Sequence, residues 1–170
     1  MAAVVSFALD EVDAVRKMLA SAALDSGGRT KLLQSIGAEM ESQTQERFST
    51  QKAPDGKPWK ALAQKTRDYY SKIGKRADML LNFEGKLLDS ITSEVQGGAW
   101  SVLTGAAMEY AAVHQFGAVI RPKSAKALMV PGYGRLQKVT IPARPYLGVS
   151  PDNAKQIAAL TAAFLAGSLS

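Results

Sequence analysis

The sequence contains no cysteine and only one histidine, His114, in 170 residues. Without cysteine there are no disulfides, no thiolate metal ligands and no cysteine nucleophiles. A zinc site needs about four ligands, so one histidine would have to be joined by several carboxylates, a set more typical of other metals. These absences argue against several classes of enzyme, and we predict that the protein uses no cofactor and no metal.

Long apolar runs are also missing, although apolar residues make up 46% of the chain. No stretch approaches the roughly 18 uninterrupted apolar residues that a membrane span needs. The amino terminus carries Asp10, Glu11 and Asp13 where a signal peptide would carry a basic region. We therefore expect a single domain over residues 1–170, of cytoplasmic origin and without a membrane partner.

Acidic side chains are scarce in two segments. Residues 52–76 hold eight basic and two acidic side chains, residues 118–148 hold six basic and none acidic, and residues 77–117 hold one basic and five acidic. Such blocks suit a nucleic acid, an acidic protein surface or the acidic segments of a neighbouring copy, although solvated basic loops give the same pattern. The candidates for a basic surface are Lys57, Lys60, Lys65, Arg67, Lys72, Lys75, Arg76, Arg121, Lys123 and Lys126.

Apolar residues spaced three and four apart predict helices at both ends of the chain. The ranges expected to be helical are 4–24, 30–48, 61–73, 84–91 and 151–170. Ser26, Gly27 and Gly28 are expected to end the first of these helices, and Ser150 to cap the last. The stretch over residues 72–78 is expected to be exposed.

The pattern changes from helical spacing to alternation after Ile91. TSEVQGGAWSVLTG, residues 92–105, predicts two strands joined by a tight turn at its glycine pair. ALMV and LQKVTI, separated by PGYG, predict a second hairpin that ends at Ile141. Long amino-terminal helices, a small and mainly antiparallel sheet, and a carboxy-terminal helix together predict an α+β fold.

His114 is either a catalytic base or a residue that completes the end of a helix. A serine triad would have to use it, but the chain has no GxSxG elbow, and GYGR at 132–135 lacks the Lys-Ser/Thr pair of a phosphate-binding loop. Gly117 follows the apolar helical run 110–116 and is predicted to be a left-handed helix cap. His114 then lies in the last turn, where a polar or partly charged imidazole suits the helix end. We interpret His114 as structural or interfacial.

Two proline-containing stretches are predicted to be ordered. APDGKPW, residues 53–59, has Pro, Asp and Gly at turn positions, and Trp59 is expected to pin this turn to the core. Pro142 and Pro145 flank Arg144, stiffen an extended segment and are expected to present the guanidinium to a carboxylate or a neighbouring subunit.

Nucleic-acid binding is a further reading of residues 52–76, where the cations are interleaved with Trp59, Tyr69 and Tyr70. Phosphate contacts combined with aromatic stacking would use such residues. The aromatics nevertheless fall at helical spacing or next to a turn, which favours burial, and no helix-turn-helix, RRM or OB signature is present.

Four short blocks stand out: RF at 47–48 with PDGKPWKAL at 54–62, LLNFEGKLLDSI at 80–91, EYAAVHQFGA at 109–118, and IPARPYLGVS at 141–150. Their order and spacing resemble the phage virion morphogenesis family, the tail-completion proteins of Mu-like phages and related prophages. The resemblance divides the chain into a helical part (1–50), a motif region (52–150) and a terminal helix (151–170). Its motif and interface candidates are Asp55, Gly56, Trp59, Tyr110, His114, Gln115, Phe116, Gly117, Pro142, Arg144 and Pro145.

The resemblance implies a non-enzymatic structural protein that caps the head-proximal end of the tail and enables head–tail joining. It implies a ring of copies, expected to be a hexamer from the symmetry of the tail, in the neck of the virion after assembly in the host cytoplasm. The implied partners are tail terminator or tube proteins, head-closure or connector proteins, and transiting DNA through non-specific contact. The alternatives are a DNA-contacting basic module of the virion neck and, third, a hydrolase that uses His114.

Overall fold

The computed structural model describes residues 3–4, 17, 26–96 and 101–167. The helices are α2 (Ser26–Thr50), α3 (Gln64–Lys72), α4 (Lys86–Asp89), α5 (Ala111–Phe116) and α6 (Pro151–Leu165). The strands are β1 (Ala3–Val4), β2 (Ile91–Val95), β3 (Val102–Ala106), β4 (Ala118–Ile120), β5 (Leu128–Val130), β6 (Gly134–Leu136) and β7 (Val139–Ile141). Helices combined with small antiparallel sheets confirm the predicted α+β class.

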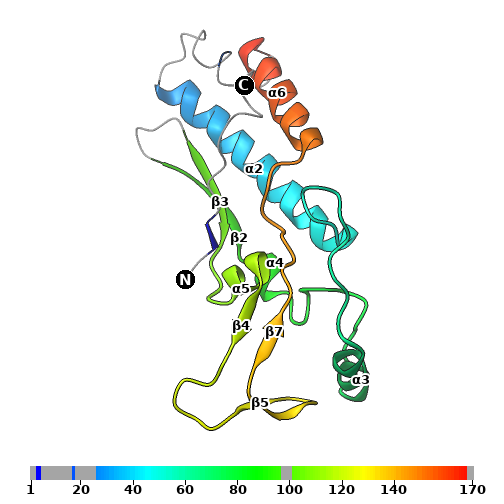
Figure 1. The fold of residues 1–170 in the computed structure, drawn as a ribbon. Coiled ribbons are helices and arrows are strands. Elements are labelled where there is room, and N and C mark those ends of the chain that lie inside the picture. The colour runs from blue at the N-terminus through cyan, green and yellow to red at the C-terminus, as the bar shows by residue number, and fades with distance from the viewer. Residues whose placement is uncertain (1–2, 5–16, 18–25, 97–100, 168–170) are drawn as a thin grey trace.

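Helix α2 is the long element on which the upper part of the molecule is built (Figure 1). Leu32, Ile36 and Met40 recur every four residues, so they share one stripe, and they form a buried cluster with Ile157 of α6. The helix predicted over 30–48 is therefore confirmed. The prediction that residues 26–28 end a helix is wrong: they lie inside α2, in its first turn.

The other helix predictions are met to different degrees. The helix predicted over 4–24 lies outside the described residues, apart from Val4, which belongs to β1, and residue 17. The helix expected over 61–73 forms as α3, but the one expected over 84–91 shortens to the single turn of α4. It stops because Ile91 already pairs with Ala106 in the central sheet.

A three-stranded antiparallel sheet of order β1-β3-β2 packs against α2. The register pairs Ile91 with Ala106 and Val95 with Val102, which confirms the first predicted hairpin. Its glycine turn lies outside the described residues. The hydroxyl of Ser93 donates to the carbonyl of Gly37 at 3.0 Å, so this face of the sheet is the one that α2 covers.

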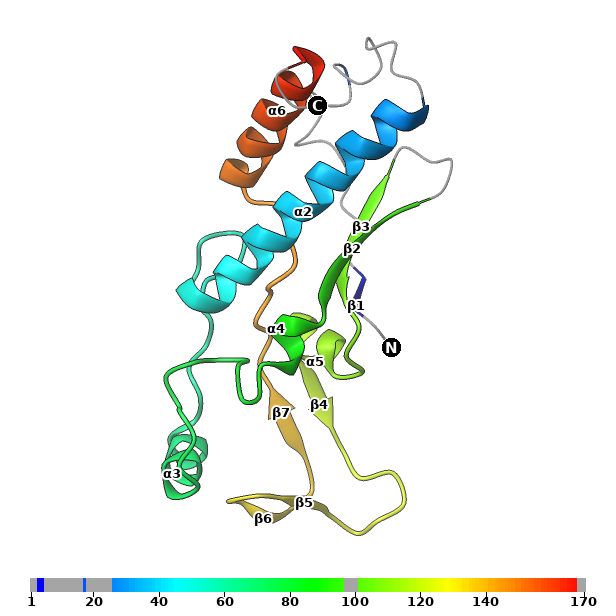
Figure 2. The ribbon, with the colours of Figure 1, turned by 180° about the vertical axis from the view of Figure 1, so that it is seen from behind.

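Residues 118–141 form an arm that extends away from the central sheet (Figures 1 and 2). It contains two separate two-stranded ladders, β4-β7 and β5-β6. The second predicted hairpin is confirmed in β5 and β6, but LQKVTI does not form one strand. Its last three residues pair instead with Ala118–Ile120, because Gly117 brings β4 directly alongside Ile141.

Three aromatic rings form the centre of the main core. Phe48 packs edge-on against Trp59, with ring centroids 5.5 Å apart and planes at 87°, and it contacts Tyr146 at the same centroid distance. The buried residues around them are Leu80, Leu87, Ile91, Ala106, Ala111 and Leu147. Each of the four sequence blocks contributes to this cluster, so their fixed order reflects how the core is assembled.

The turn at residues 53–59 and the start of α6 have the local structure that the sequence predicts. In the turn at 53–59, Gly56 has φ of +80° and the N–H of Lys57 donates to Asp55 Oδ1 at 3.0 Å. At the start of α6, the hydroxyl of Ser150 accepts from the N–H of Asn153 at 3.1 Å, and the Asn153 side chain accepts from the N–H of Ser150.

The buried indole supplies a first prediction. Trp59 is 6% exposed, so Trp59→Ala should lower the free energy of unfolding by about 3–5 kcal/mol in urea denaturation. Met129→Ala is the matched control, because Met129 is 72% exposed and its loss should change that free energy by less than about 0.5 kcal/mol. Equal effects of the two substitutions would contradict the central position of Trp59.

Candidate interaction surface

An extended segment, Arg144–Leu147, crosses the core without belonging to a strand. Gln115 of α5 satisfies much of its backbone: Oε1 accepts from the N–H groups of Tyr146 and Leu147, each at 3.0 Å. The Nε2 of the same side chain donates to the carbonyl of Leu147 at 3.0 Å. Gln115 is buried and therefore takes the place of a neighbouring strand, a role that the sequence analysis did not assign to it.

Two side chains from the earlier blocks complete this segment. Trp59 Nε1 donates to the carbonyl of Pro145 at 2.7 Å, and Arg47 Nη1 donates to the carbonyl of Tyr146 at 2.9 Å. Burial lowers the pKa of Arg47, which nevertheless has a second partner in the side chain of Asn153. The first of the four sequence blocks is thus hydrogen-bonded directly to the fourth.

Arg144 does not face a carboxylate or a neighbouring subunit, which corrects the expectation from its flanking prolines. It is 4% exposed, and Nε donates to the carbonyl of Lys60 at 2.7 Å. Nη2 donates to the carbonyl of Ala61 at 3.4 Å, while the Arg144 N–H donates to the carbonyl of His114 at 2.8 Å. Lys60 and Ala61 lie outside helices, strands and turns, so the guanidinium supplies hydrogen-bond donors that regular secondary structure does not give to their carbonyls.

His114 lies in the final turn of α5, half-buried, with its ring edge-on to Tyr110 at a centroid distance of 5.7 Å. Its Nδ1 is buried and has no hydrogen-bond partner among the described residues. Burial lowers the pKa of His114, and the positive charge of Arg144 lowers it further. Of the two forms predicted for this helix end, polar or partly charged, the lowered pKa favours the neutral polar imidazole.

Gly117 ends α5 and turns the chain into the arm. Its φ of +73° has the predicted sign, but its ψ of 165° lies in the extended positive-φ region, which only glycine adopts readily, and not in the left-handed helical region. A Cβ at this position would lie 2.8 Å from the N of Ala143 and 3.0 Å from the O of Ile141. The glycine therefore permits close contact between the two chain segments that carry the arm.

Large apolar side chains are exposed along α5 and the arm. This apolar strip consists of Tyr110, Phe116, Val119, Ile120 and Met129. Phe116 is 64% exposed and Val119 58% exposed. Val119 and Ile120 are consecutive in β4, so their side chains point to opposite faces of the ladder. Large exposed apolar side chains on one segment of the chain favour a surface that binds other proteins. Val119, Ile120 and Met129 were not among the sequence candidates, and the apolar triplets AVI and LMV within a segment free of acidic residues are the signal that would have identified them.

The structure brings the two basic segments together. The hydroxyls of Thr66 in α3 and Tyr133 in the β5–β6 turn lie 2.7 Å apart, and Lys65 Nζ lies 4.9 Å from the centroid of the Tyr133 ring. Helix α3 thus adjoins the tip of the arm. The cations that are exposed as predicted are Lys57, Lys60, Lys65, Lys72, Lys75, Arg76, Arg121, Lys123 and Lys126.

The remaining members of the basic segments are less available. Arg67 is half-buried and donates to the carbonyl of Leu62 at 2.8 Å. Tyr70 packs against Phe83 at a centroid distance of 5.0 Å, and burial raises its pKa. These contacts engage Arg67 and Tyr70, so these two side chains are less available for phosphate binding and base stacking.

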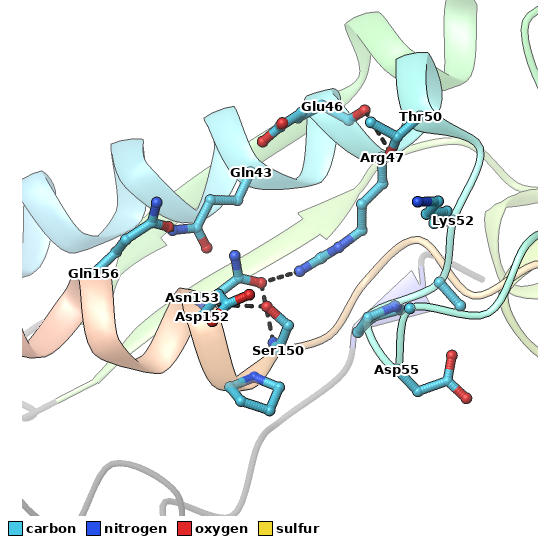
Figure 3. Close-up of a pocket in the computed structure, with 14 residues that line it drawn as sticks. Gln43, Glu46, Arg47, Thr50, Lys52, Asp55, Ser150, Asp152, Asn153 and Gln156 are labelled. Atoms are coloured by element: carbon cyan, nitrogen blue, oxygen red, sulfur yellow. Dashed lines mark hydrogen bonds between the residues drawn. The ribbon is translucent and has the colours of Figure 1, made fainter.

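A polar groove of about 480 Å³ separates the carboxyl end of α2 from the turn at 53–56 and the first turn of α6 (Figure 3). The Arg47 guanidinium points toward Asn153, which also caps α6, and Gln43 donates to Gln156 at 2.6 Å. These side chains bind one another across the groove and join α2 to α6. They include no nucleophile paired with a base.

The described part of the chain contains no group of three or more histidine or carboxylate side chains placed to hold a metal ion. None of its helices is both long enough and apolar enough to cross a membrane.

An apolar strip beside a basic arm is typical of a protein that works by contact with other macromolecules. The sequence profile of the phage virion morphogenesis family matches residues 10–166, and the chain belongs to that family. The chain is 35% identical over 130 residues to Mu-like prophage FluMu G protein 2 of Haemophilus influenzae, which covers 76% of this chain and 72% of that protein. No solved structure matches the chain. The resemblance of the four blocks is confirmed, and the chain is a protein of phage virion morphogenesis.

The position of Gly117 gives a second prediction. Gly117→Ala should lower the free energy of unfolding by at least about 1–3 kcal/mol, because the new Cβ adds a backbone clash to the strain of positive φ. Gly74→Ala is a matched control, since Gly74 has φ of +67° and no atom within 4 Å of an added Cβ. In thermal and urea unfolding, the Gly117→Ala protein should be clearly less stable than the Gly74→Ala protein. The reverse order of stability would contradict the close contact of Gly117 with Ile141 and Ala143.

The lowered pKa of His114 gives a third prediction. The unfolded chain, with a histidine pKa near 6.5, binds a proton more readily than the folded one. Stability is therefore complete above about pH 6.5 and falls as the pH drops toward the lower folded pKa, by at most about 1.4 kcal/mol per pH unit. Urea unfolding between pH 7.5 and 5.5 should show this decline in the wild type and a flatter profile in His114→Gln. Parallel profiles would show that the imidazole titrates freely.

Proposed function

We propose that this protein is a non-enzymatic structural component that completes the tail at its head-proximal end and enables the head to join. The apolar strip and the basic arm support this role, because they expose side chains suited to protein contact on a chain of the virion morphogenesis family. The relative in Haemophilus influenzae is a protein of a Mu-like prophage. The single histidine is engaged in packing, which favours a structural role over a hydrolytic one.

In this proposal several copies form a ring in the neck of the virion, with the sixfold symmetry expected of a tail. One face of the ring meets tail tube or terminator proteins, and the other meets head-closure or connector proteins. A ring requires two different patches on each copy that fit each other. The division of the charge into basic and acidic segments along the chain supports two such patches.

DNA contact is the second candidate, and the meeting of the two basic segments at Lys65 and Tyr133 favours it. Cations that line a channel would hold passing DNA without reading its sequence. The apolar strip on the same arm argues for protein, because phosphates offer nothing to Phe116 or Met129. A steep salt dependence of DNA binding by the purified protein would favour the DNA-contacting module.

A fourth prediction tests the proposed function. Lys123→Glu combined with Lys126→Glu should leave the chain folded, because both side chains are exposed, and should weaken head–tail joining by removing attraction to acidic partners. Electron microscopy of lysates should then show separate heads and tails. Lys31→Glu is the control, since Lys31 is an exposed cation of α2 outside the basic segments. Unchanged joining over a range of salt concentrations would mean that the arm cations are only solvated surface.

A further inference from the structure

We propose that the arm of one copy docks, through the face of its β4-β7 ladder that carries Val119, on the outer face of the β1-β3-β2 sheet of a second copy. The contact is head to tail, because the arm and the receiving sheet are different surfaces of the same chain. This inference deepens the proposed ring and rests on it, since it names the two surfaces that would hold neighbouring copies together.

The first reason is that the β4-β7 ladder has no covering layer. Among the described helices and strands, β4 and β7 make extensive contact only with each other, and the ladder contains three residue pairs. A two-stranded ladder alone is marginally stable in water, because it buries little apolar surface. Val119 pairs with Thr140, and both side chains are exposed on one face. The apolar side chain of Val119 on that face becomes buried only when another surface covers it.

The second reason is the chemistry of the arm, which excludes pairing with another arm. The arm has no acidic residue, and its exposed cations are Arg121, Lys123, Lys126, Arg135 and Lys138. Two arms in contact would bring like charges together, which is unfavourable at an interface. The occupant must accept apolar side chains and also present negative charge. A protein surface with exposed acidic groups satisfies both requirements.

The third reason is that the chain carries such a surface on its own central sheet. Ser93 faces α2, since its hydroxyl bonds to Gly37, and it shares that face with Thr104 at an oxygen distance of 2.8 Å. Side chains alternate along a strand, so Thr92 and Glu94 point away from α2, and both are exposed. Glu94 forms no ion pair with any described residue. This outer face therefore has an unused negative charge.

On the outer face, the neighbouring strand β3 places little side-chain bulk beside Thr92 and an apolar side chain beside Glu94. Thr92 pairs with Gly105, which has no side chain, and Glu94 pairs with Leu103. A ladder with Val119 at its centre can lie against this surface while an arm cation approaches Glu94. Because the arm and the sheet lie at different levels of the molecule (Figures 1 and 2), each copy can give an arm on one side and receive one on the other. Such a heterologous contact closes into a ring when the rotation allows it.

Disulfide cross-linking tests the contact, because the wild-type chain has no cysteine that would react. A chain carrying both Val119→Cys and Thr92→Cys should give a ladder of covalent oligomers on oxidation, in purified protein and in assembled tails. Chains with one cysteine each, mixed in equal amounts, should give the mixed dimer as the main product. Ile73→Cys replaces Val119→Cys in the control; Ile73 is 42% exposed on a different element, and this pair should give only monomer.

Three results would overturn the contact. In the first, the mixture of single-cysteine chains gives mainly a dimer through Val119→Cys, which shows that two arms pair with each other. In the second, the pair of Val119→Cys with Thr92→Cys and the pair of Ile73→Cys with Thr92→Cys give equal yields of cross-linked product. In the third, the chain with both Val119→Cys and Thr92→Cys stays monomeric in assembled tails after oxidation. The proposed function can fail separately: heads and tails that still join when the protein is deleted would contradict it, while the cross-linking result would still decide the contact. If head–tail joining requires the protein but assembled tails give no cross-link, the contact between arm and sheet is contradicted and the proposed function stands.

Discussion

The fold depends on a short piece of extended backbone whose hydrogen bonds are made almost entirely by side chains. From the carbonyl of Pro145 to the carbonyl of Leu147, each backbone polar group has a partner in Trp59, Arg47 or Gln115. A buried peptide group without a partner costs about 1–3 kcal/mol, so these three side chains are required in combination. They come from α2, the proline turn and α5, and the segment thereby fixes the positions of elements that are far apart in sequence.

The sequence predicted the elements that depend on local signals. Helix α2, the hairpin of β2 and β3, the turn at Gly56 and the cap at Ser150 were all expected, because periodicity and turn chemistry determine them within a few residues. The predictions from the sequence were wrong where pairing with a distant strand, and not the local sequence, determines the structure. Ile91 looks helical in its own segment but pairs with Ala106, and β4 is too short to be recognised before its partner is known.

The candidate residues fall into the same two groups, those that the sequence identified and those that only the structure shows. Trp59, Gln115 and Arg144, which came from the family blocks, are buried and hold the core together. Side chains on the arm, such as Val119 and Met129, were missed because exposure is a property of the fold and not of the residue type. The convergence of the two basic segments was also beyond the sequence, since it results from a contact between Thr66 and Tyr133, 67 residues apart. The family blocks thus describe how the chain folds, whereas the exposed side chains of the arm become apparent only in the structure.

The arm joins the rest of the molecule through two neighbouring strands of chain, which pass each other at Gly117 and Ala143. A second attachment holds it near its far end, where the hydroxyls of Tyr133 and of Thr66 in α3 lie 2.7 Å apart. The backbone angles of Gly117 and this contact with α3 together set the direction in which the arm points. If neighbouring copies meet through the arm, these two points also set the curvature of the assembly, and so the diameter of the opening that it surrounds.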